Sequence, residues 1–463
     1  MISPKGYDFE ADLHQFRWQG LDILLDVNSG AIHILDDITV RFLEKLKEYS
    51  GDGERVLRDL AAEFPLDELR EVAEELDSAY QAGALFSEAE KVLVDLSGLP
   101  IKALCLNIAH ACNMKCRYCF AAQGDFGLQP ALMSLETGQK ALDFLIANCG
   151  LVSNLEVDFF GGEPLLNAKM LQELVQYGRQ RGKECGKHFN FTLTTNALLL
   201  NDDIIDFIID NEISVILSLD GRPETNDRHR ILNSGQGSYE RILPNIIKMV
   251  ARNPLSYYIR GTFTRENKDF SQDLQHLVEL GFEAVSLEPA IGPENEYSIR
   301  EADLPEVLRE YEQLTDLLCH YYRSGKELHF FHYNLDLQKG PCLAKRYSGC
   351  GAGVEYLVVT PEGSIYPCHQ FVGEDEFMMG NIYDAYLNES IKQRFTSNRL
   401  YNKPECLRCW ARYFCGGGCH ANAHHANGDM SRPSQVSCAM HKKRIEGAVY
   451  LEMVKKLERS ICL

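Results

Sequence analysis

Three cysteines at positions 112, 116 and 119 stand in the stretch HACNMKCRYCF with C-x3-C-x2-C spacing. The chain has 16 cysteines in 463 residues, so chance alone gives about 0.02 such runs and the spacing indicates metal ligation. A structural zinc site is usually closed by four protein ligands, and only His110 could complete one locally. A four-iron cluster held by three thiolates instead leaves one iron open for another molecule.

A second group of cysteines lies near the C-terminal end of the chain. Twelve residues separate Cys350 from Gly363, and four more residues lead to Cys368. The stretch CLRCWARYFCGGGC follows, with C-x2-C-x5-C-x3-C spacing, and Cys438 comes last. In a chain of this cysteine content, chance gives well under about 0.001 occurrences of that spacing. Zinc is an alternative occupant of the four spaced cysteines. These four are Cys406, Cys409, Cys415 and Cys419.

Composition limits the class of protein that can carry these cysteines. A chain of 463 residues is too long for one core, so two or three domains are expected. The net charge of −20 argues against nucleic acid or an anionic membrane surface as the main partner. The sequence has no long apolar run and its start lacks a signal-peptide pattern, which predicts a cytoplasmic protein. Cysteines in that compartment favour metal binding over disulfides.

The middle of the chain alternates between strand-like and helix-like segments. The periodic stretches 134–149 and 167–182 are typical of helices that separate strands. Repeated β–α units predict a parallel sheet with helices outside, and right-handed crossovers curve it into a partial (β/α)6 TIM-like barrel. The six strand-like segments are 101–109, 155–160, 189–195, 214–220, 257–264 and 284–289.

Polar and glycine-rich motifs follow these predicted strands in turn. The cysteine run follows the first strand, GGEP (161–164) the second and TTNA (194–197) the third. SLDG (218–221) ends the fourth strand, and NDRHR (226–230) comes soon after it. Each motif alone is weak evidence, because such residues are common in turns. Their convergence at the carboxyl ends of parallel strands, where barrel enzymes place their chemistry, predicts one active site.

These motifs resemble those of radical S-adenosylmethionine (SAM) enzymes, which use C-x3-C-x2-C with an aromatic residue before the last cysteine, here Tyr118. The resemblance implies that Cys112, Cys116 and Cys119 hold a 4Fe–4S cluster whose open iron binds SAM. The cofactors then generate a 5′-deoxyadenosyl radical, while the protein orients and shields them. It also implies SAM contacts from Tyr118, Gly161, Gly162, Glu163, Pro164, Thr195, Asn196, Ser218, Asp220 and Arg230.

Individual SAM contacts follow from the same resemblance. Glu163 is expected to meet the SAM ammonium, for which a carboxylate is a suitable partner. Ser218 and Arg230 match the positions that bind the SAM carboxylate, and a guanidinium suits that group. Thr195 and Asn196 are expected to reach the ribose or the methionyl part.

The C-terminal cysteines resemble the SPASM extension of radical SAM enzymes, which usually holds two further 4Fe–4S clusters. The resemblance assigns Cys350, Cys368 and Cys419 to one of them. Cys342 either completes this set or leaves its fourth iron open, and the sequence does not decide between the two. The other cluster is assigned to Cys406, Cys409, Cys415 and Cys438. Three 4Fe–4S clusters are therefore expected in total.

Residues 1–95, here called the front domain, contain no cysteine. Apolar and polar residues alternate in 14–37 around the turn signal DVNSG (26–30), which predicts a β-hairpin. Helices are expected at 38–49, 53–64 and 67–86. This order resembles a winged helix. DNA binding is opposed by the acidic stretch 61–77, which spans parts of the second and third expected helices. The peptide-recognition element of ribosomal-peptide maturases has the same architecture and binds a leader peptide by strand addition. The alternative is a domain that only caps the barrel.

The whole chain resembles the maturases of SCIFF, the six-cysteine peptides, which install thioether bridges. The resemblance implies a cysteine-rich precursor peptide as substrate and an electron donor such as flavodoxin or ferredoxin. It divides the chain into a leader-recognition domain (1–95), a radical SAM barrel (96–325) and a SPASM domain (326–463). Sulfatase-maturing relatives typically place Asp after the cysteine matched by Cys368, whereas this chain has His369. A radical SAM epimerase, a sulfatase-type maturase and an iron–sulfur electron-transfer protein remain alternatives.

Overall fold

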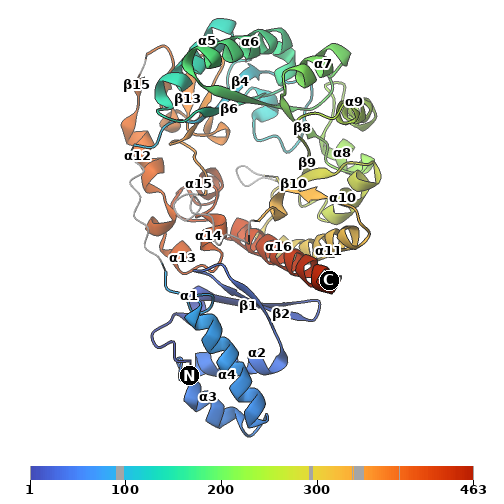
Figure 1. Ribbon diagram of the computed structural model, residues 1–463. Coiled ribbons are helices and arrows are strands. Elements are labelled where there is room, and N and C mark those ends of the chain that lie inside the picture. The colour runs from blue at the N-terminus through green and yellow to red at the C-terminus, as the bar shows by residue number, and fades with distance from the viewer. Residues whose placement is uncertain are drawn as a thin grey trace.

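The computed structural model describes residues 2–89, 98–290, 296–335, 337, 349–384 and 386–461. Figure 1 shows a curved sheet with helices on its outer side, a cysteine-rich C-terminal part beside it, and the front domain at one end of the molecule. Cys342 lies outside the described residues. No described helix has the length and apolar character needed to cross a membrane.

Six parallel strands form the centre of the large sheet, and each coincides closely with a predicted strand. Side chains alternate between buried and partly exposed along β7, because successive residues of a strand point to opposite faces. The neighbours in the sheet follow chain order, as expected for repeated β–α units. In order they are β4 (Ala103–His110), β6 (Asn154–Gly161), β7 (His188–Thr195), β8 (Ser214–Ser218), β9 (Tyr257–Phe263) and β10 (Ala284–Pro289).

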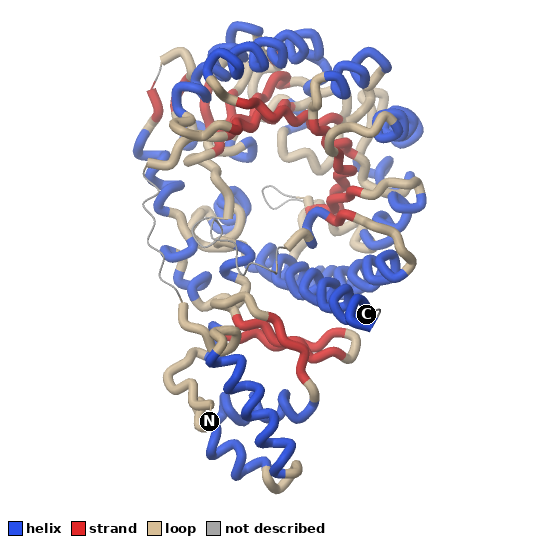
Figure 2. Tube along the Cα trace, in the orientation of Figure 1, coloured by secondary structure: helices blue, strands red, loops and turns tan. Residues whose placement is uncertain are grey.

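Helices connect these strands and cover the outer face of the sheet (Figure 2). The hydroxyl of Ser134 caps the first by accepting the N–H of Thr137 at 3.1 Å. The second ends at Gly186, whose φ of 65° is a conformation that glycine adopts readily. The helices are α5 (Leu135–Asn148), α6 (Ala168–Cys185), α7 (Asp202–Asp210), α8 (Pro223–His229), α9 (Tyr239–Ala251), α10 (Phe270–Glu279) and α11 (Leu304–Arg323).

The large sheet continues into the cysteine-rich part of the chain. Strand β12 (Tyr356–Val359) pairs in parallel with β4, and the antiparallel strands β13 (Ser364–Tyr366), β14 (Gly380–Asn381) and β15 (Tyr386–Leu387) follow. At the opposite edge β11 (His329–Phe330) pairs with β10. The described sheet starts at β11 and ends at β15 without closing on itself. The barrel and the cysteine-rich part therefore share one sheet across the predicted boundary at residue 325.

The front domain contains a three-stranded antiparallel sheet and the three expected helices. The turn after Asp26 lies where the sequence predicts it, but a second tight turn at Gln19 and Gly20 splits the expected first strand of the hairpin. The hairpin around the predicted turn is therefore confirmed, and what the sequence misses is the additional strand that precedes it. Both turn residues have positive φ, 46° and 83°, as two-residue hairpin turns require. The elements are β1 (Leu13–Trp18), β2 (Leu21–Asp26), β3 (Ile32–Leu35), α2 (Asp37–Glu48), α3 (Gly53–Leu60) and α4 (Leu66–Gln81).

Both faces of this small sheet are covered. Leu24 is buried in the core that the front domain builds with its own helices, whereas Trp18, Ile23 and Leu25 belong to the main core of the molecule. Figure 1 shows the sheet between the helices of the front domain and the long C-terminal helix α16 (Gln435–Ile461). Adjacent strand residues point to opposite faces, so one strand can serve both cores.

Arg412, in the cysteine-rich part, ties the front domain to the rest of the chain. Its side chain is 4% exposed and donates to the carbonyl of Ala11 and to Oδ1 of Asn28, each at 2.7 Å. It also binds the carboxylate of Asp12. Beside it the rings of His14 and Trp410 stack with centroids 3.7 Å apart. The guanidinium thus satisfies three acceptors from two segments of the front domain.

Replacing Arg412 with Met should destabilise the docked front domain by about 3 kcal/mol, because the variant leaves Asp12 and two further acceptors without their partner. Arg408→Met is the matched control. Arg408 is 72% exposed and lies 3.5 Å from Asp8, so its pair contributes at most about 0.5 kcal/mol. Chemical unfolding and limited proteolysis of residues 1–95 measure both effects, with iron content checked in parallel. Equal stability of the two variants would contradict the role of Arg412 in attaching the front domain to the rest of the chain.

Candidate active site

The cysteine run forms a loop directly after β4 and lines a cavity of about 180 Å³ at the carboxyl ends of the strands. Close packing holds this loop against the second motif. A Cβ added to Gly124 would lie 2.7 Å from Cβ of Cys112 and 2.9 Å from Cα of Gly162. Because these distances are too short for a side chain, glycine is required at position 124.

Backbone N–H groups point at the sulfurs of this loop. Cys119 accepts from Ala121, Gln123 and Gly124, and Cys112 accepts from Met114. Burial raises the pKa of the Cys112 thiol to about 11 and that of Cys116 to about 12. A bare thiolate is therefore disfavoured here, and an anionic sulfur needs a cation beside it. Sulfurs that are buried and receive N–H donors fit an iron–sulfur cluster.

The GGEP motif bends tightly against the cysteine loop at the end of β6. Added Cβ atoms on Gly161 and Gly162 would lie 2.3 Å from the carbonyl oxygen of Ala109 and 2.1 Å from that of Ala111. Gly162 N–H donates to Ala109 and Glu163 N–H donates to Ala111, each at 2.8 Å. The two glycines therefore let the backbone approach so closely that Glu163 is delivered to the cavity wall.

Glu163 is fully buried, and its carboxylate joins the ends of two strands. One oxygen accepts the Thr195 hydroxyl at 2.8 Å and the Leu165 N–H at 3.0 Å, and the other accepts the Asn196 N–H at 2.8 Å. Burial raises the pKa of Glu163, while these donors oppose the rise. The amide of Asn196 also donates to Oδ1 of Asn113 in the cysteine loop at 2.7 Å.

A buried network lies on the far side of the cysteine loop. The hydroxyl of Tyr118 donates to Asp220 at 2.7 Å and accepts from Arg230 at 3.2 Å. The second oxygen of Asp220 accepts the N–H of Thr262 at 3.0 Å. Burial raises the pKa of Asp220 to about 6, and the nearby guanidinium of Arg230 opposes the rise. Tyr118 and Arg230 line the cavity, whereas Asp220 stands behind them and orients them.

Most of the predicted SAM contacts therefore share one cavity. Ser218 lies on its wall at the end of β8. Pro164 does not line the cavity and instead starts a short 3-10 turn, Pro164–Asn167. The predicted residues on the wall are Cys112, Cys116, Tyr118, Cys119, Gly161, Gly162, Glu163, Thr195, Asn196, Ser218 and Arg230.

The remaining wall of the cavity consists of residues that the sequence patterns did not single out for a SAM site. The ring of His369 packs against those of Phe120 and Phe160, with centroids 5.3 and 5.2 Å away, and burial lowers its pKa to about 4. Arg260, in the middle of β9, donates to Glu288 near the end of β10 at 2.7 Å. The one sequence signal for these additional residues is that Glu288 lies near the end of a predicted strand, where the other motifs also lie.

The C-terminal cysteines form two sets that adjoin each other. The thiol of Cys438 is electrostatically coupled to those of Cys406, Cys409 and Cys415. Cys368 is coupled instead to Cys350 and Cys419. The second set again receives backbone donors, including the N–H of Gln370 on the sulfur of Cys368 at 3.4 Å. Members of both sets line a cavity of about 320 Å³, namely Cys350, Cys415, Cys419 and Cys438.

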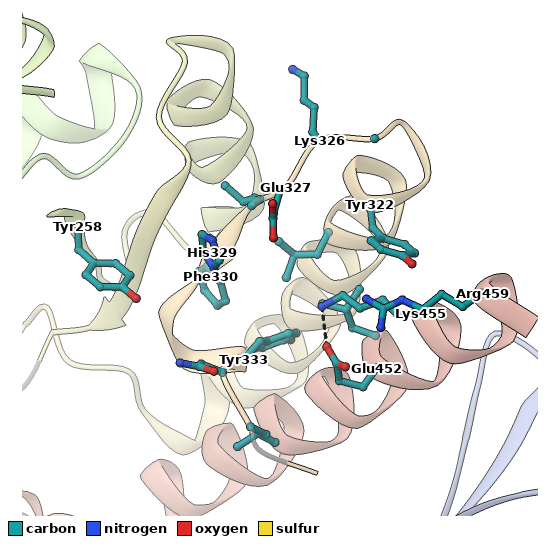
Figure 3. A pocket seen from close by; sticks show the side chains of 16 residues that line it. Tyr258, Tyr322, Lys326, Glu327, His329, Phe330, Tyr333, Glu452, Lys455 and Arg459 are labelled. Atoms are coloured by element: carbon teal, nitrogen blue, oxygen red, sulfur yellow. Dashed lines mark hydrogen bonds and ion pairs between the residues drawn. The ribbon is translucent and has the colours of Figure 1, made fainter. Parts of the chain in front are cut away.

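A larger cavity of about 410 Å³ lies elsewhere and contains no cysteine (Figure 3). It is bounded by β11, the start of β9 and the C-terminal helix, with Tyr258, Tyr333 and His329 on its wall. Lys455 and Glu452 pair at 2.6 Å beside it. Because Tyr258 is near the amino end of β9, this cavity is at the opposite end of the strands from the cysteine loop.

Comparison with known families agrees with this arrangement. The model of the radical SAM superfamily matches residues 106–286, and that of the SPASM iron–sulfur cluster-binding domain matches residues 350–410. The first range contains the cysteine loop and the motifs at the strand ends, and the second begins at Cys350. These two ranges are therefore similar to the two domains of radical SAM proteins that carry a SPASM domain.

Two curated proteins illustrate the range of its relatives. A cysteine-type anaerobic sulfatase-maturating enzyme of Clostridium novyi is 24% identical over 339 residues, which cover 67% of this chain and 85% of that protein. The radical SAM cyclopropyl synthase TigE of Paramaledivibacter caminithermalis is 21% identical over 458 residues, which cover 91% of both chains.

Solved structures show the same fold. The complex of anSMEcpe with AdoMet and the Cp18Cys peptide has a TM-score of 0.64 and 21% identity, and covers 78% of this chain and 99% of that one. Streptococcus suis SuiB bound to precursor peptide SuiA has a TM-score of 0.52 and 16% identity, and covers 92% of this chain and 98% of that one.

Proposed function

We propose that the chain installs thioether cross-links between cysteine sulfur and carbon in a ribosomally made, cysteine-rich precursor peptide. The observation that carries this proposal is the shared wall formed by residues 368–370. His369 and Gln370 line the SAM cavity, while Cys368 belongs with Cys350 and Cys419. An auxiliary cluster would therefore lie directly behind the wall of the cavity where carbon chemistry takes place. An open iron there would bind a peptide thiolate, since metals ligate thiolate rather than thiol.

Different residues of the cavity have different proposed roles in this reaction. When bound, the cluster and SAM supply a 5′-deoxyadenosyl radical that removes a hydrogen atom from a peptide carbon. Glu163 and Arg230, which line the cavity, would bind the ammonium and carboxylate of SAM. Asp220 accepts from Tyr118, which in turn accepts from Arg230, so these hydrogen bonds would hold both side chains in position. Phe120, Phe160 and His369 form the side of the cavity left for the peptide and keep bulk water away from it.

The front domain is proposed to bind the leader of this peptide. Its β3 forms the edge of the small sheet, and Ile34 on that edge is 41% exposed. A free strand edge can accept an extended peptide as a further strand. SuiB, which was solved with its precursor peptide, covers nine-tenths of this chain, so its match reaches into the front domain. This supports peptide recognition over simple capping of the barrel.

A sulfatase-type oxidising maturase is the second candidate, since relatives of that class cover two-thirds of the chain. His369 argues against it, because the cysteine-adjacent Asp of those enzymes is replaced here by an imidazole whose pKa burial lowers to about 4. A SAM cavity with Glu163 and Arg230 on its wall also argues against a pure electron carrier.

Mass spectrometry of a precursor peptide incubated anaerobically with enzyme, SAM and reductant separates these candidates. The proposal predicts loss of two hydrogen atoms per bridge and one fewer thiol available for alkylation. One hydrogen atom leaves the carbon for 5′-deoxyadenosine. The thiol loses its proton, and the proposed auxiliary cluster would accept the one electron that is released as the bond between carbon and sulfur forms. A product that has exchanged sulfur for a carbonyl oxygen would identify the oxidising maturase. A product of unchanged mass in ordinary water, which gains one deuterium at an α carbon in heavy water, would identify an epimerase.

A further inference from the structure

Lys403 is a buried cation that neither the SAM site nor the peptide site uses. Its side chain is only 1% exposed, and its ammonium donates to the carbonyl of Gly417 at 2.9 Å. Within the described part of the chain, no carboxylate lies within ion-pair distance of it. An ammonium that is removed from water without a counter-charge is strongly destabilising. Some negative charge near Lys403 must therefore offset its burial.

The groups around Lys403 are thiols from both auxiliary sets. Cys406 and Cys415 from one set, and Cys350 and Cys419 from the other, interact electrostatically with its ammonium. Gly417, whose carbonyl accepts from this ammonium at 2.9 Å, lines the same cavity as Cys350, Cys415 and Cys419. The ammonium is stable here when the sulfurs are anionic, as they are when they ligate iron. Lys403 thus fits a site flanked by two clusters better than one flanked by neutral thiols.

The loop that carries the acceptor of Lys403 also joins the two sets. Gly416, Gly417 and Gly418 connect Cys415 to Cys419, and their φ angles are 71°, 98° and 78°. Three successive residues in this conformation are accessible only to glycine at low energy. A Cβ on Gly417 would lie 3.6 Å from the ammonium. The chain therefore turns around the Lys403 side chain as it passes from one cluster site to the other.

We propose that the ammonium of Lys403 lies between the two auxiliary clusters and raises the reduction potential of both. This inference rests on the proposed presence of two auxiliary clusters. One-electron reduction adds negative charge to a cluster, so a nearby fixed cation stabilises the reduced form. The effect is strong inside a protein, because water does not screen it. One residue would thereby set the potentials of both clusters together.

Redox titration followed by electron paramagnetic resonance tests this role on the full-length, reconstituted enzyme. Lys403→Met removes the charge and keeps most of the side-chain volume, and Lys403→Arg keeps the charge. Lys442→Met is the matched control, because Lys442 acts electrostatically on Cys438, a member of one set. Iron analysis comes first, since about twelve irons per chain establish that all three clusters are present.

Both auxiliary potentials should shift to more negative values in Lys403→Met and stay near wild type in Lys403→Arg. The potential of the SAM cluster should not move, and Lys442→Met should shift one auxiliary cluster at most. Unchanged auxiliary potentials in a fully loaded Lys403→Met would overturn the proposal. If Lys403→Met does not load the auxiliary clusters but Lys403→Arg does, the result supports a requirement for positive charge at this position. If neither variant loads them, the proposal is rejected. Wild-type iron near four per chain would instead refute the auxiliary clusters themselves.

Discussion

Replacing Cys112, Cys116 and Cys119 together with Ala should abolish formation of 5′-deoxyadenosine while the C-terminal clusters remain. The three sulfurs line the same cavity as Glu163 and Arg230. Without them no iron is held where SAM would bind, so the electron cannot reach the sulfonium. Mutation of a cluster ligand removes the chemistry itself, in contrast to mutation of a group that only orients a substrate.

Chromatographic detection of 5′-deoxyadenosine in the presence of dithionite measures this loss. The variant should retain about eight of about twelve irons per chain, because its auxiliary ligands are untouched. Cys185→Ala is the control, since this thiol is exposed at the end of α6 and belongs to neither cysteine set. Continued SAM cleavage by the triple variant would reject the assignment. Loss of nearly all iron would show that the clusters assemble interdependently.

The parts of the fold that sequence predicted well are those determined by local patterns. All six parallel strands are predicted from short strand-like runs, in which buried residues recur at alternate positions, as along β7. The cysteine loop, GGEP and the ends of β7 and β8 were expected to meet, since parallel strands end at one edge. Ser218 and Arg230 accordingly line one cavity although α8 separates them in sequence.

The parts that sequence missed depend on contacts between distant segments. The turn at Gln19 carries only a single glycine signal, and the strands on either side read as one alternating run. His369 reaches the SAM cavity because β12 adds to the edge strand β4, and no local pattern encodes that pairing. Lys403 is an ordinary charged residue in sequence. Its burial follows from packing against a glycine loop that lies fourteen residues further along the chain.

Replacing Ile34 with Pro should weaken binding of the leader peptide by about 30-fold while the front domain stays folded. In an antiparallel pair of strands, residues whose backbone groups bond to the partner strand alternate with residues whose backbone groups point away from it. Asp26 and Ala31 form a bonded pair, because the N–H of Asp26 donates to the carbonyl of Ala31 at 2.9 Å. The backbone groups of His33 and Leu35 therefore face β2, and those of Ile34 face outward from the sheet edge. Proline is tolerated at such edge positions because the N–H that it removes serves no bond within the sheet.

The expected loss corresponds to about two main-chain hydrogen bonds of about 1 kcal/mol each, since the proline ring removes one donor and obstructs its neighbour. Ile34→Ala is the matched control, because it shortens the same side chain and keeps the N–H. Fluorescence anisotropy with a labelled precursor peptide, with and without its leader, measures the affinities. Uncoupled SAM cleavage should be equal in all variants, since no predicted cluster or SAM ligand lies in the front domain. If Ile34→Pro binds the leader as tightly as Ile34→Ala, strand addition at β3 is wrong and the small sheet only covers the C-terminal core.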